Sequence, residues 1–325
     1  MLHKFAKTLT MEKLVSIVVP VFNESGNLKP LLKKLYEIFS DEYRYEVIFV
    51  DDGSTDDTME QLRKISVQDK RVFYVSFSRN FGHQNALKAG LDKATGDCVI
   101  SLDGDLQHPP LLIPEMLAFW EQDYDIVYTR RCEDKRLSSM KRITSAWYGR
   151  ILKLLSGMPI EQGVADFRLL DRKVVDVLLL FREPDIFFRG VIYWTGFRKT
   201  AIDYRPEPRF SGQTKYSTAK MLQLAMQGIT SFSVKPLYVS VFLGILFILV
   251  SLIYAIFVIW SVAAGRSVAG WASTIISIVF MGGINLFMLG IIGIYISKIF
   301  IQTKYRPAYI IRETNCPNLF GMKNK

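Results

Sequence analysis

The sequence is poor in cysteine and histidine and lacks several common nucleotide-binding and metal-binding motifs. Its three cysteines, Cys98, Cys132 and Cys316, have neither disulfide nor metal spacing, which suits a reducing compartment. No G-x-G-x-x-G follows the first apolar run and no G-x-x-x-x-G-K-[ST] occurs, so dinucleotide dehydrogenases and P-loop enzymes are disfavoured. The three histidines form no H-E-x-x-H pair, which argues against zinc hydrolysis.

Charged residues are missing from two long stretches of the C-terminal third. None lies between Lys235 and Arg266 or between Arg266 and Lys298, and each gap exceeds the roughly 20 apolar residues that cross a bilayer core. We therefore predict two transmembrane helices, Leu237–Val262 and Trp271–Ser297. Two buried core helices are the alternative, but uninterrupted runs of this length are rare in soluble folds.

Positive charges flank these stretches and predict their orientation. Three lysines precede the first stretch and four cations follow the second, whereas the connecting loop holds only Arg266; the flanking residues are Lys215, Lys220, Lys235, Lys298, Lys304, Arg306 and Arg312. Both ends of the chain should therefore face the cytoplasm, in an inner-membrane protein. The N-terminus is basic without a long apolar segment, so no signal peptide is expected. The net charge of +10 suits anionic lipid, although nucleic acid would attract the same sign.

Short apolar runs alternate with helix-period segments over the first 130 residues. The runs are Val15–Val21, Val47–Val50, Val72–Phe77, Cys98–Leu102 and Ile126–Tyr128, and the helical segments are Leu28–Phe39, Thr58–Ile65, Asn85–Ala94 and Leu111–Trp120. This alternation predicts an α/β fold with a mostly parallel sheet covered on both faces.

Polar clusters follow each of the five runs. They begin at Pro20 ("PVFNES"), Asp51 ("DDGSTDD"), Ser78 ("SRNFGHQN"), Asp103 ("DGDLQHPP") and Thr129 ("TRR"). A single cluster is compatible with ordinary turn chemistry, as at Asp51–Ser54. Because ligands bind beyond the carboxyl ends of parallel strands, five such clusters on one rim predict a binding site.

The cluster "DGDLQHPP" has the composition of a metal site. If the chain stays extended past Leu102, Asp103, Asp105 and Gln107 project to one side and offer hard oxygen ligands to Mg²⁺ or Mn²⁺. Such a metal would bind a diphosphate and offset charge on a departing nucleotide. An exposed acidic turn is the alternative.

Four of these motifs in order, "SIVVPVFNE", "VDDGSTDDT", "SRNFGHQNALKAGLDKATGD" and "SLDGDLQHPP", resemble the GT-A glycosyltransferases of family 2. The later "YTRR", "ADFRLL" and "RFSGQTKYS", followed by two spans, are similar to the polyisoprenyl-phosphate glycosyltransferases, which include bactoprenol glucosyltransferases and dolichol-phosphate mannose synthase. The resemblance implies metal-dependent, inverting transfer of a sugar, glucose by family precedent, from a UDP-sugar to polyprenyl phosphate at the cytoplasmic membrane face. Nucleic acid is not an expected partner.

The resemblance also assigns roles to individual residues. Pro20, Val21, Glu24 and Asp52 should hold uridine, and Asp103 and Asp105 should meet the diphosphate, with Gln107 completing the metal shell. The pair reads "DGD" where many relatives have "DAD", and we expect the middle side chain to point away. Arg130, Arg131 and Arg142 should grip the acceptor phosphate, and Arg209 and Lys215 should form a flap over a phosphate. A solvated helix face at Lys141 and Arg142, and a basic linker held by lipid at Arg209 and Lys215, stay open as alternatives.

Relatives place Asp166 near the reacting carbon and often treat it as a base. A phosphate monoester with a second pKa near 6 is already mostly ionised at pH 7, so its oxygen hardly needs a base. We therefore expect Asp166 to orient Arg168 or an acceptor-side arginine, or to bond the sugar. Helix capping is the alternative.

Four regions are expected: a catalytic domain over 1–212, an interfacial helix over 213–236, two membrane helices over 237–300, and a cytoplasmic strand and tail over 301–325. The strand Ala308–Arg312 should return to a sheet edge, its own or a neighbour's. Gly283 and Gly290 permit close helix packing and a homo-oligomer.

Two other functions compete with sugar transfer to a lipid. A processive polysaccharide synthase should carry Q-x-x-R-W after the acidic pair and more spans, but the nearest string, starting at Gln68, lacks tryptophan and precedes the pair. A non-catalytic sensor of nucleotide sugars would need only the donor pocket.

Overall fold

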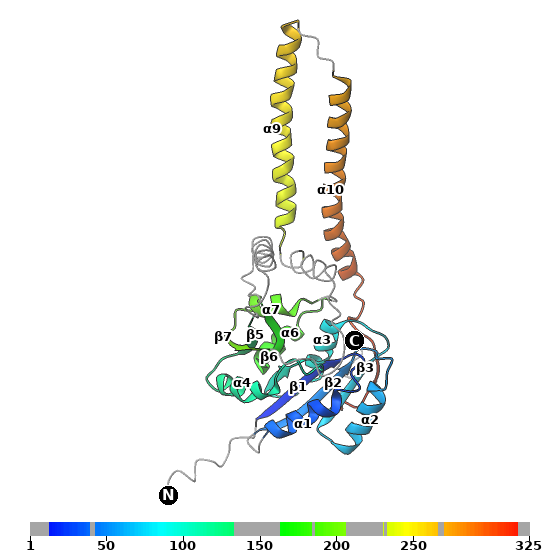
Figure 1. Cartoon of the computed structure of the whole chain (residues 1–325), viewed down its shortest axis with the longest axis vertical. Coiled ribbons are helices and arrows are strands. Elements are labelled where there is room, and N and C mark those ends of the chain that lie inside the picture. The colour runs from blue at the N-terminus through cyan, green and yellow to red at the C-terminus, as the bar shows by residue number, and fades with distance from the viewer. Residues whose placement is uncertain are drawn as a thin grey trace. The chain divides into compact units, whose positions relative to one another are not determined.

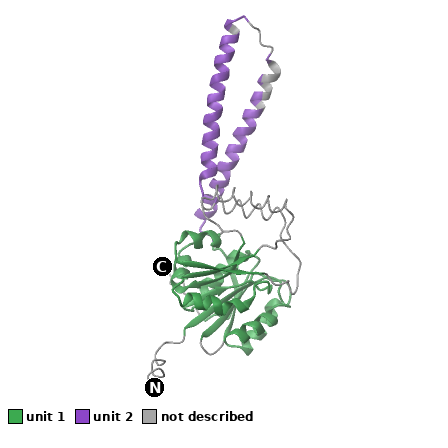
Figure 2. Ribbon diagram, turned by 60° about the vertical axis from the view of Figure 1, so that its left-hand side comes forward, with its two compact units in different colours: residues 1–146, 159–217, 307–325 green, residues 147–158, 218–306 purple. Residues whose placement is uncertain are grey.

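A computed structural model describes residues 13–39, 43–132, 163–183, 186–205, 230, 233–265 and 270–317. The chain divides into two compact units, coloured separately in Figure 2. Residues 1–146, 159–217 and 307–325 form unit 1, and residues 147–158 and 218–306 form unit 2. Most of the predicted interfacial helix over 213–236 lies outside the described residues.

Unit 1 contains one sheet of eight strands in the order β7-β5-β6-β4-β1-β2-β3-β8 (Figure 1). The strands are β1 Leu14–Val21, β2 Arg44–Asp51, β3 Val72–Phe77, β4 Cys98–Ser101, β5 Ile126–Arg131, β6 Val164–Asp171, β7 Lys199–Tyr204 and β8 Ile311–Thr314. Four neighbouring pairs are parallel, whereas β6 is antiparallel to β4 and β5, and β8 is antiparallel to β3. The predicted mostly parallel α/β sheet is confirmed.

The described helices of unit 1 are α1 Leu28–Ile38, α2 Thr58–Gln68, α3 His83–Lys93, α4 Ile113–Trp120, α6 Arg172–Leu179 and α7 Phe188–Trp194. A 3₁₀ turn, Pro110–Leu112, precedes α4, because proline suits a helix start but cannot continue a strand. All four helices predicted in the first 130 residues are present, and none of their ends is shifted by more than three residues.

Strand β1 is buried on both faces, which explains why its sequence is apolar except at Ser16 rather than alternating. Val15, Ile17 and Val19 belong to an apolar cluster that includes buried side chains of α1 and α4. Val18 faces α3, where a Cβ added at Gly90 would lie 2.1 Å from Val18 Cγ1. The close approach of helix to strand fixes the start of α3 relative to the carboxyl end of β1.

The C-terminal segment of unit 1 joins the chain's own sheet. Strand β8 begins three residues later than predicted and extends the edge beside β3. The Glu313 carboxylate accepts hydrogen bonds from Arg63 Nε at 2.9 Å and from the Tyr74 hydroxyl at 2.8 Å. The Tyr309 ring stacks on Phe77 with centroids 5.0 Å apart. These contacts make the segment an integral part of the fold.

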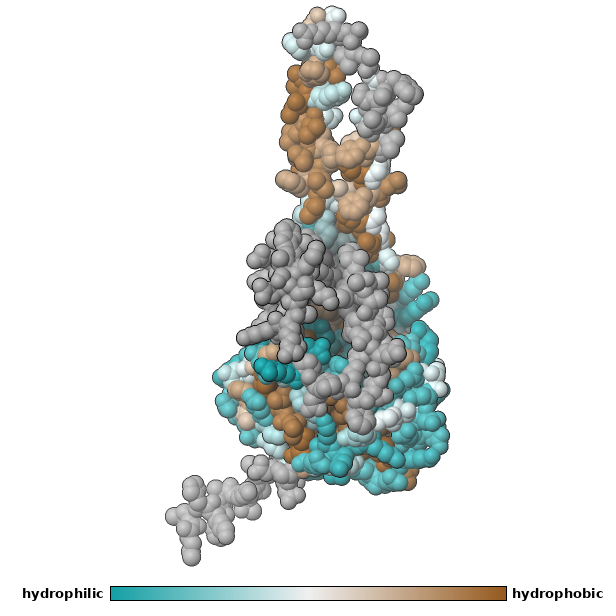
Figure 3. All heavy atoms as spheres, in the orientation of Figure 1, coloured by the Kyte–Doolittle hydropathy of each residue, from teal (hydrophilic) through white to brown (hydrophobic). Residues whose placement is uncertain are grey.

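Unit 2 is described mainly as two long helices, α9 Lys235–Ala263 and α10 Trp271–Thr303. Each contains a candidate membrane span, Lys235–Ser261 with mean hydropathy 3.0 and Phe280–Thr303 with mean hydropathy 2.0. Their large apolar side chains are exposed, as the brown surface of these helices in Figure 3 shows. Surfaces of this kind mark contact with lipid or protein rather than water. Helix α10 extends six residues beyond the predicted end at Ser297.

Candidate active site

Two strands of opposite direction bring the site together at the carboxyl edge of the sheet. Strand β4 ends at Ser101, and Asp103 follows it. Because β6 runs antiparallel to β4, the beginning of β6 lies at the same edge, with Arg168 in register with Ser101. The Ser101 hydroxyl donates a hydrogen bond to the backbone carbonyl of Asp166 at 2.6 Å. Asp166 is thereby placed beside Ser101, which lies 65 positions earlier in the chain.

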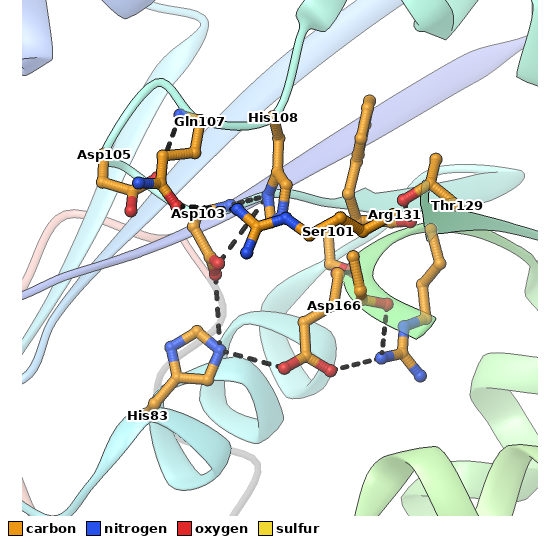
Figure 4. Close-up of polar contacts among 12 residues, drawn as sticks. His83, Ser101, Asp103, Asp105, Gln107, His108, Thr129, Arg131 and Asp166 are labelled. Carbon is orange, nitrogen blue, oxygen red and sulfur yellow. Dashed lines mark hydrogen bonds and ion pairs between the residues drawn. The ribbon is translucent and has the colours of Figure 1, made fainter. Parts of the chain in front are cut away.

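The acidic cluster forms a turn, so the extended chain predicted past Leu102 is wrong. The backbone turns at Gly104 and Asp105, and Leu106 has a positive φ of 61°. The Leu106 side chain is buried and anchors the turn. Figure 4 shows the side chains of Asp103, Asp105 and Gln107 along this turn. Gln107 N donates to Asp105 Oδ1 at 3.1 Å, and this local bond fixes the direction of one carboxylate.

The middle position of "DGD" packs against β1. A Cβ added at Gly104 would lie 2.8 Å from Cγ1 of Val21 on β1. Beneath the turn, the buried His108 accepts a hydrogen bond at Nδ1 from Asp103 N at 3.2 Å and stacks on Phe167. The turn is therefore held by packing from two strands as well as by its own hydrogen bonds.

Asp166 is buried and is paired with two arginines. Its Oδ1 accepts from Arg168 and, at 3.2 Å, from Arg189 Nε, while Oδ2 accepts from Arg189 Nη2 at 2.8 Å. Burial alone would raise the pKa of this carboxyl, but Arg189 and Arg168 hold the pKa of Asp166 well below its usual range. Asp166 lies inside β6 and caps no helix, whereas Asp171 caps α6. The predicted contact with Arg168 is present.

His83 completes the polar network, and sequence reasoning assigned it no role. It is the first residue of α3, and its Nε2 lies 3.4 Å from Asp103 Oδ1 and 3.7 Å from Asp166 Oδ2 (Figure 4). Burial lowers the pKa of an imidazole, but here the carboxylates of Asp103 and Asp166 outweigh it and raise the pKa of His83 to about 9. The only signal in the sequence was its position inside the polar cluster that begins at Ser78.

Arg189 is the second residue that the sequence did not reveal. It lies on α7, which follows no strand of the predicted α/β alternation. Its fork-like contact with Asp166 joins α7 to β6, and its side chain is 37% exposed. No local pattern distinguishes such an arginine from a surface residue, so only the folded chain identifies it.

The arginines at the end of β5 point to different partners. Arg131 donates through Nη2 to Gln107 Oε1 at 3.2 Å, which brings it to the acidic turn. Arg130 instead pairs with Asp203 of β7, with Nε 2.7 Å from Oδ1. This division follows from the alternation of side chains along a strand. The predicted phosphate-binding residues Arg142, Arg209 and Lys215, and Lys141, lie outside the described residues.

The residues predicted to hold uridine lie along the same edge. Pro20 and Val21 end β1, and Glu24 accepts from Asn27 Nδ2 at 2.5 Å. The buried Asp52 accepts from the backbone N–H groups of Phe81, at 2.6 Å, and Gly82. Burial raises the pKa of Asp52 above its usual value, although these N–H groups partly offset the effect of burial. Asp52 thus shapes the loop before His83, and its contact with uridine stays a prediction.

The α/β sheet with an acidic turn beyond its carboxyl edge is that of a GT-A glycosyltransferase. The chain belongs to the family described as "Glycosyl transferase family 2", which matches residues 16–179. It is 40% identical over 312 residues to "Uncharacterized glycosyltransferase YkcC" of Bacillus subtilis (strain 168), covering 95% of both chains. It is 38% identical over 301 residues to "Prophage bactoprenol glucosyl transferase homolog" of Escherichia coli (strain K12), covering 92% of this chain and 98% of the relative.

A further relative is "Bactoprenol glucosyl transferase" of Shigella phage SfV, 38% identical over 92% of this chain and 98% of the relative. Among solved structures, glucosyl-3-phosphoglycerate synthase from Mycobacterium tuberculosis, in complex with Mn²⁺, UDP and glucosyl-3-phosphoglycerate, matches with a TM-score of 0.44 and 21% identity. That match covers 67% of this chain and 78% of the synthase.

Proposed function

We propose that this glycosyltransferase moves a sugar, glucose by the names of its relatives, from a UDP-sugar to polyprenyl phosphate at the cytoplasmic membrane face. One observation carries the proposal: a half-buried acidic turn and a buried aspartate surrounded by cations meet at one edge of the sheet. The first is suited to a metal-bound diphosphate and the second to a phosphate nucleophile.

The donor half is the turn that holds Asp103 and Asp105. Both side chains are half-buried and therefore accessible. No group of three His, Cys, Asp or Glu side chains within the described ranges could hold a metal together. Two carboxylates nevertheless fit Mg²⁺ or Mn²⁺, because Mg²⁺ usually takes one or two carboxylates and completes its shell with phosphate oxygens and water. When bound, the cation would neutralise charge on the departing diphosphate. Gln107 is a third candidate ligand, and its Oε1 already accepts a hydrogen bond from Arg131.

The acceptor half has an excess of positive charge. Around the single carboxylate of Asp166 lie the guanidinium groups of Arg168 and Arg189 and the imidazole of His83. Arg168 is almost completely buried, so its charge is poorly screened by water. A phosphate group brought beside this cluster would be attracted by it, because arginine binds phosphate through charge-assisted hydrogen bonds. Arg130, Arg131, Arg142, Arg209 and Lys215 are proposed to add to this attraction.

The proposed reaction is a direct displacement with inversion. An oxygen of polyprenyl phosphate attacks the anomeric carbon, the new C–O bond forms on that oxygen, and the bond to the diphosphate breaks with its electron pair leaving on UDP. The nucleophile is already ionised near pH 7. Asp166 needs to accept no proton, and its depressed pKa makes it a poor base. Its role is to orient Arg168 and Arg189, so catalysis comes mainly from alignment and charge neutralisation.

The two apolar helices support a lipid acceptor. A membrane-spanning pair would keep the enzyme where polyprenyl phosphate resides. We propose that both termini are cytoplasmic, that residues 213–236 form the interfacial helix, and that residues 1–212, 237–300 and 301–325 form the other three regions. A homo-oligomer through the face with Gly283 and Gly290 is part of this proposal; a Cβ at either position would meet nothing within 4 Å.

The decisive experiment uses the full chain purified in detergent with polyprenyl phosphate. A panel of labelled UDP-sugars is supplied with and without Mg²⁺ or Mn²⁺, and the lipid fraction is analysed for label. We expect one labelled lipid phosphate, formed only with metal. The proposal is refuted if no UDP-sugar yields a labelled lipid. If the Asp105→Asn variant transfers sugar as well as the wild type, the activity comes from a contaminating enzyme and the chain is a non-catalytic sensor.

A further inference from the structure

His83 occupies a fixed position at the start of α3. The loop before it is tied to the sheet, because Asp52 accepts hydrogen bonds from the N–H groups of Phe81 and Gly82. Ser78 N, at the beginning of this loop, donates to Ile310 O at 3.0 Å. Gly82 has a φ of 96°, a conformation that favours glycine, and it directs the chain into the helix. The backbone that carries the imidazole is therefore held on two sides.

The imidazole reaches both halves of the site. Nε2 lies 3.4 Å from Asp103 Oδ1 on the turn and 3.7 Å from Asp166 Oδ2 on β6 (Figure 4). Arg168 and Arg189 pair with Asp166, and His108 approaches Asp103 from the other side, with Nδ1 3.7 Å from Oδ2. In the described part of the chain, His83 is the side chain whose ion-pair contacts include both carboxylates.

We propose that His83 is a positioning residue that sets the distance and orientation between Asp103, a ligand of the metal and diphosphate, and Asp166, the centre of the acceptor half. Two carboxylates that face each other repel, and a donor between them offsets that repulsion. The side chains that hydrogen-bond metal-ligating groups orient those groups, and their loss typically costs metal affinity or activity. This inference rests on the proposed function, and its binding measurement depends on the donor half of that function alone.

The geometry permits a matched pair of variants. In His83→Gln, the amide nitrogen is separated from the backbone by as many bonds as Nε2 of histidine, so a donor stays between the carboxylates. In His83→Asn, the amide nitrogen corresponds to Nδ1 and cannot reach them. Lys64→Gln is the control, because it removes an exposed cation of α2 whose recorded pair is Glu60 on the same helix.

Three quantities are measured on the full chain in detergent: thermal unfolding, binding of UDP with Mn²⁺ by titration calorimetry, and sugar transfer to polyprenyl phosphate. We expect His83→Asn to unfold at the wild-type temperature while losing roughly 10- to 100-fold in Mn²⁺-dependent UDP affinity, in kcat, or in both. His83→Gln should recover most of the loss, and Lys64→Gln should match the wild type.

The inference is overturned if His83→Asn binds and transfers like the wild type. It is also overturned if His83→Gln is as defective as His83→Asn, since the ring or its charge would then matter rather than the donor. If the wild type transfers no sugar to polyprenyl phosphate but the two variants still differ in Mn²⁺-dependent UDP binding, the proposed function fails and the role of His83 stands. If His83→Asn and His83→Gln differ neither in UDP binding nor in sugar transfer, the role of His83 is refuted and the proposed function is not affected.

Discussion

The two acidic regions of the site, the turn over Asp103–Gln107 and the buried Asp166, contain the same chemical group in opposite surroundings. The turn is half-exposed and is built from neighbours in sequence, such as Asp105 and Gln107. Asp166 is buried and paired with arginines from β6 and α7. The surroundings of each carboxylate, rather than its residue type, therefore decide its role. Accessible carboxylates can bind a metal, whereas a carboxylate paired with arginines orients those arginines.

The largest effect should come from the turn. Asp105→Asn keeps an oxygen for the bond from Gln107 N but removes the negative charge, so we expect transfer to fall about 10³-fold with little change in thermal unfolding. Rates of lipid labelling and an unfolding curve test this. Asp176→Asn on α6, a 64% exposed position, is the matched control. A variant that keeps a tenth of the activity would remove the turn from the proposed mechanism.

Asp166→Asn should differ from the turn variant by damaging stability as well as activity. It leaves the buried Arg168 without its carboxylate, and breaking a buried ion pair costs about 3 kcal/mol. Misplacement of the arginines should lower kcat about 100-fold. Denaturant unfolding in detergent, run beside Asp105→Asn, measures the contrast. Equal stability of the two variants would show that Asp166 is not the structural centre of the acceptor half.

The arginines of β5 offer a smaller contrast. Arg131→Gln removes a charge-assisted hydrogen bond to the turn and should reduce kcat/KM about tenfold. Arg130→Gln breaks an exposed pair, whose side chains are 42% and 50% exposed, and pairs of this kind contribute about 1 kcal/mol or less. Steady-state kinetics on both substrates compares the two. A larger loss for Arg130→Gln would identify Arg130 as the principal phosphate ligand at this strand end.

The smallest effect is expected on the pH profile. The pKa of Asp166 is depressed in the folded chain relative to an ordinary 3.8, so its contribution to stability is present above about pH 4 and is lost as the pH falls toward the folded pKa. An acid limb near pH 6 in kcat/KM should reflect the acceptor phosphate. Its midpoint should be the same in wild type and Asp166→Asn, and a limb that disappears in the variant would identify Asp166 as a base.

Much of the fold was predictable because its signals are local. The apolar runs that became β1 to β5 and the four helices between them follow from residue periodicity. Strand β6 was not predicted, since its eight residues pair with strands formed more than 30 residues earlier. The turn after β4 was predicted by composition but not by shape, because the packing of Gly104 against Val21 depends on a neighbouring strand.

By itself the sequence determined the α/β alternation, the two long apolar helices and the acidic cluster after β4, because periodicity, length and charge act over short distances along the chain. Only the tertiary structure decided which side chains besides Arg168 meet Asp166. Arg189 and His83 reach it from α7 and α3, and Arg131 rather than Arg130 reaches the turn. The reason is physical: the antiparallel direction of β6 and the alternation of side chains along β5 are set by strand pairing, which no single segment specifies.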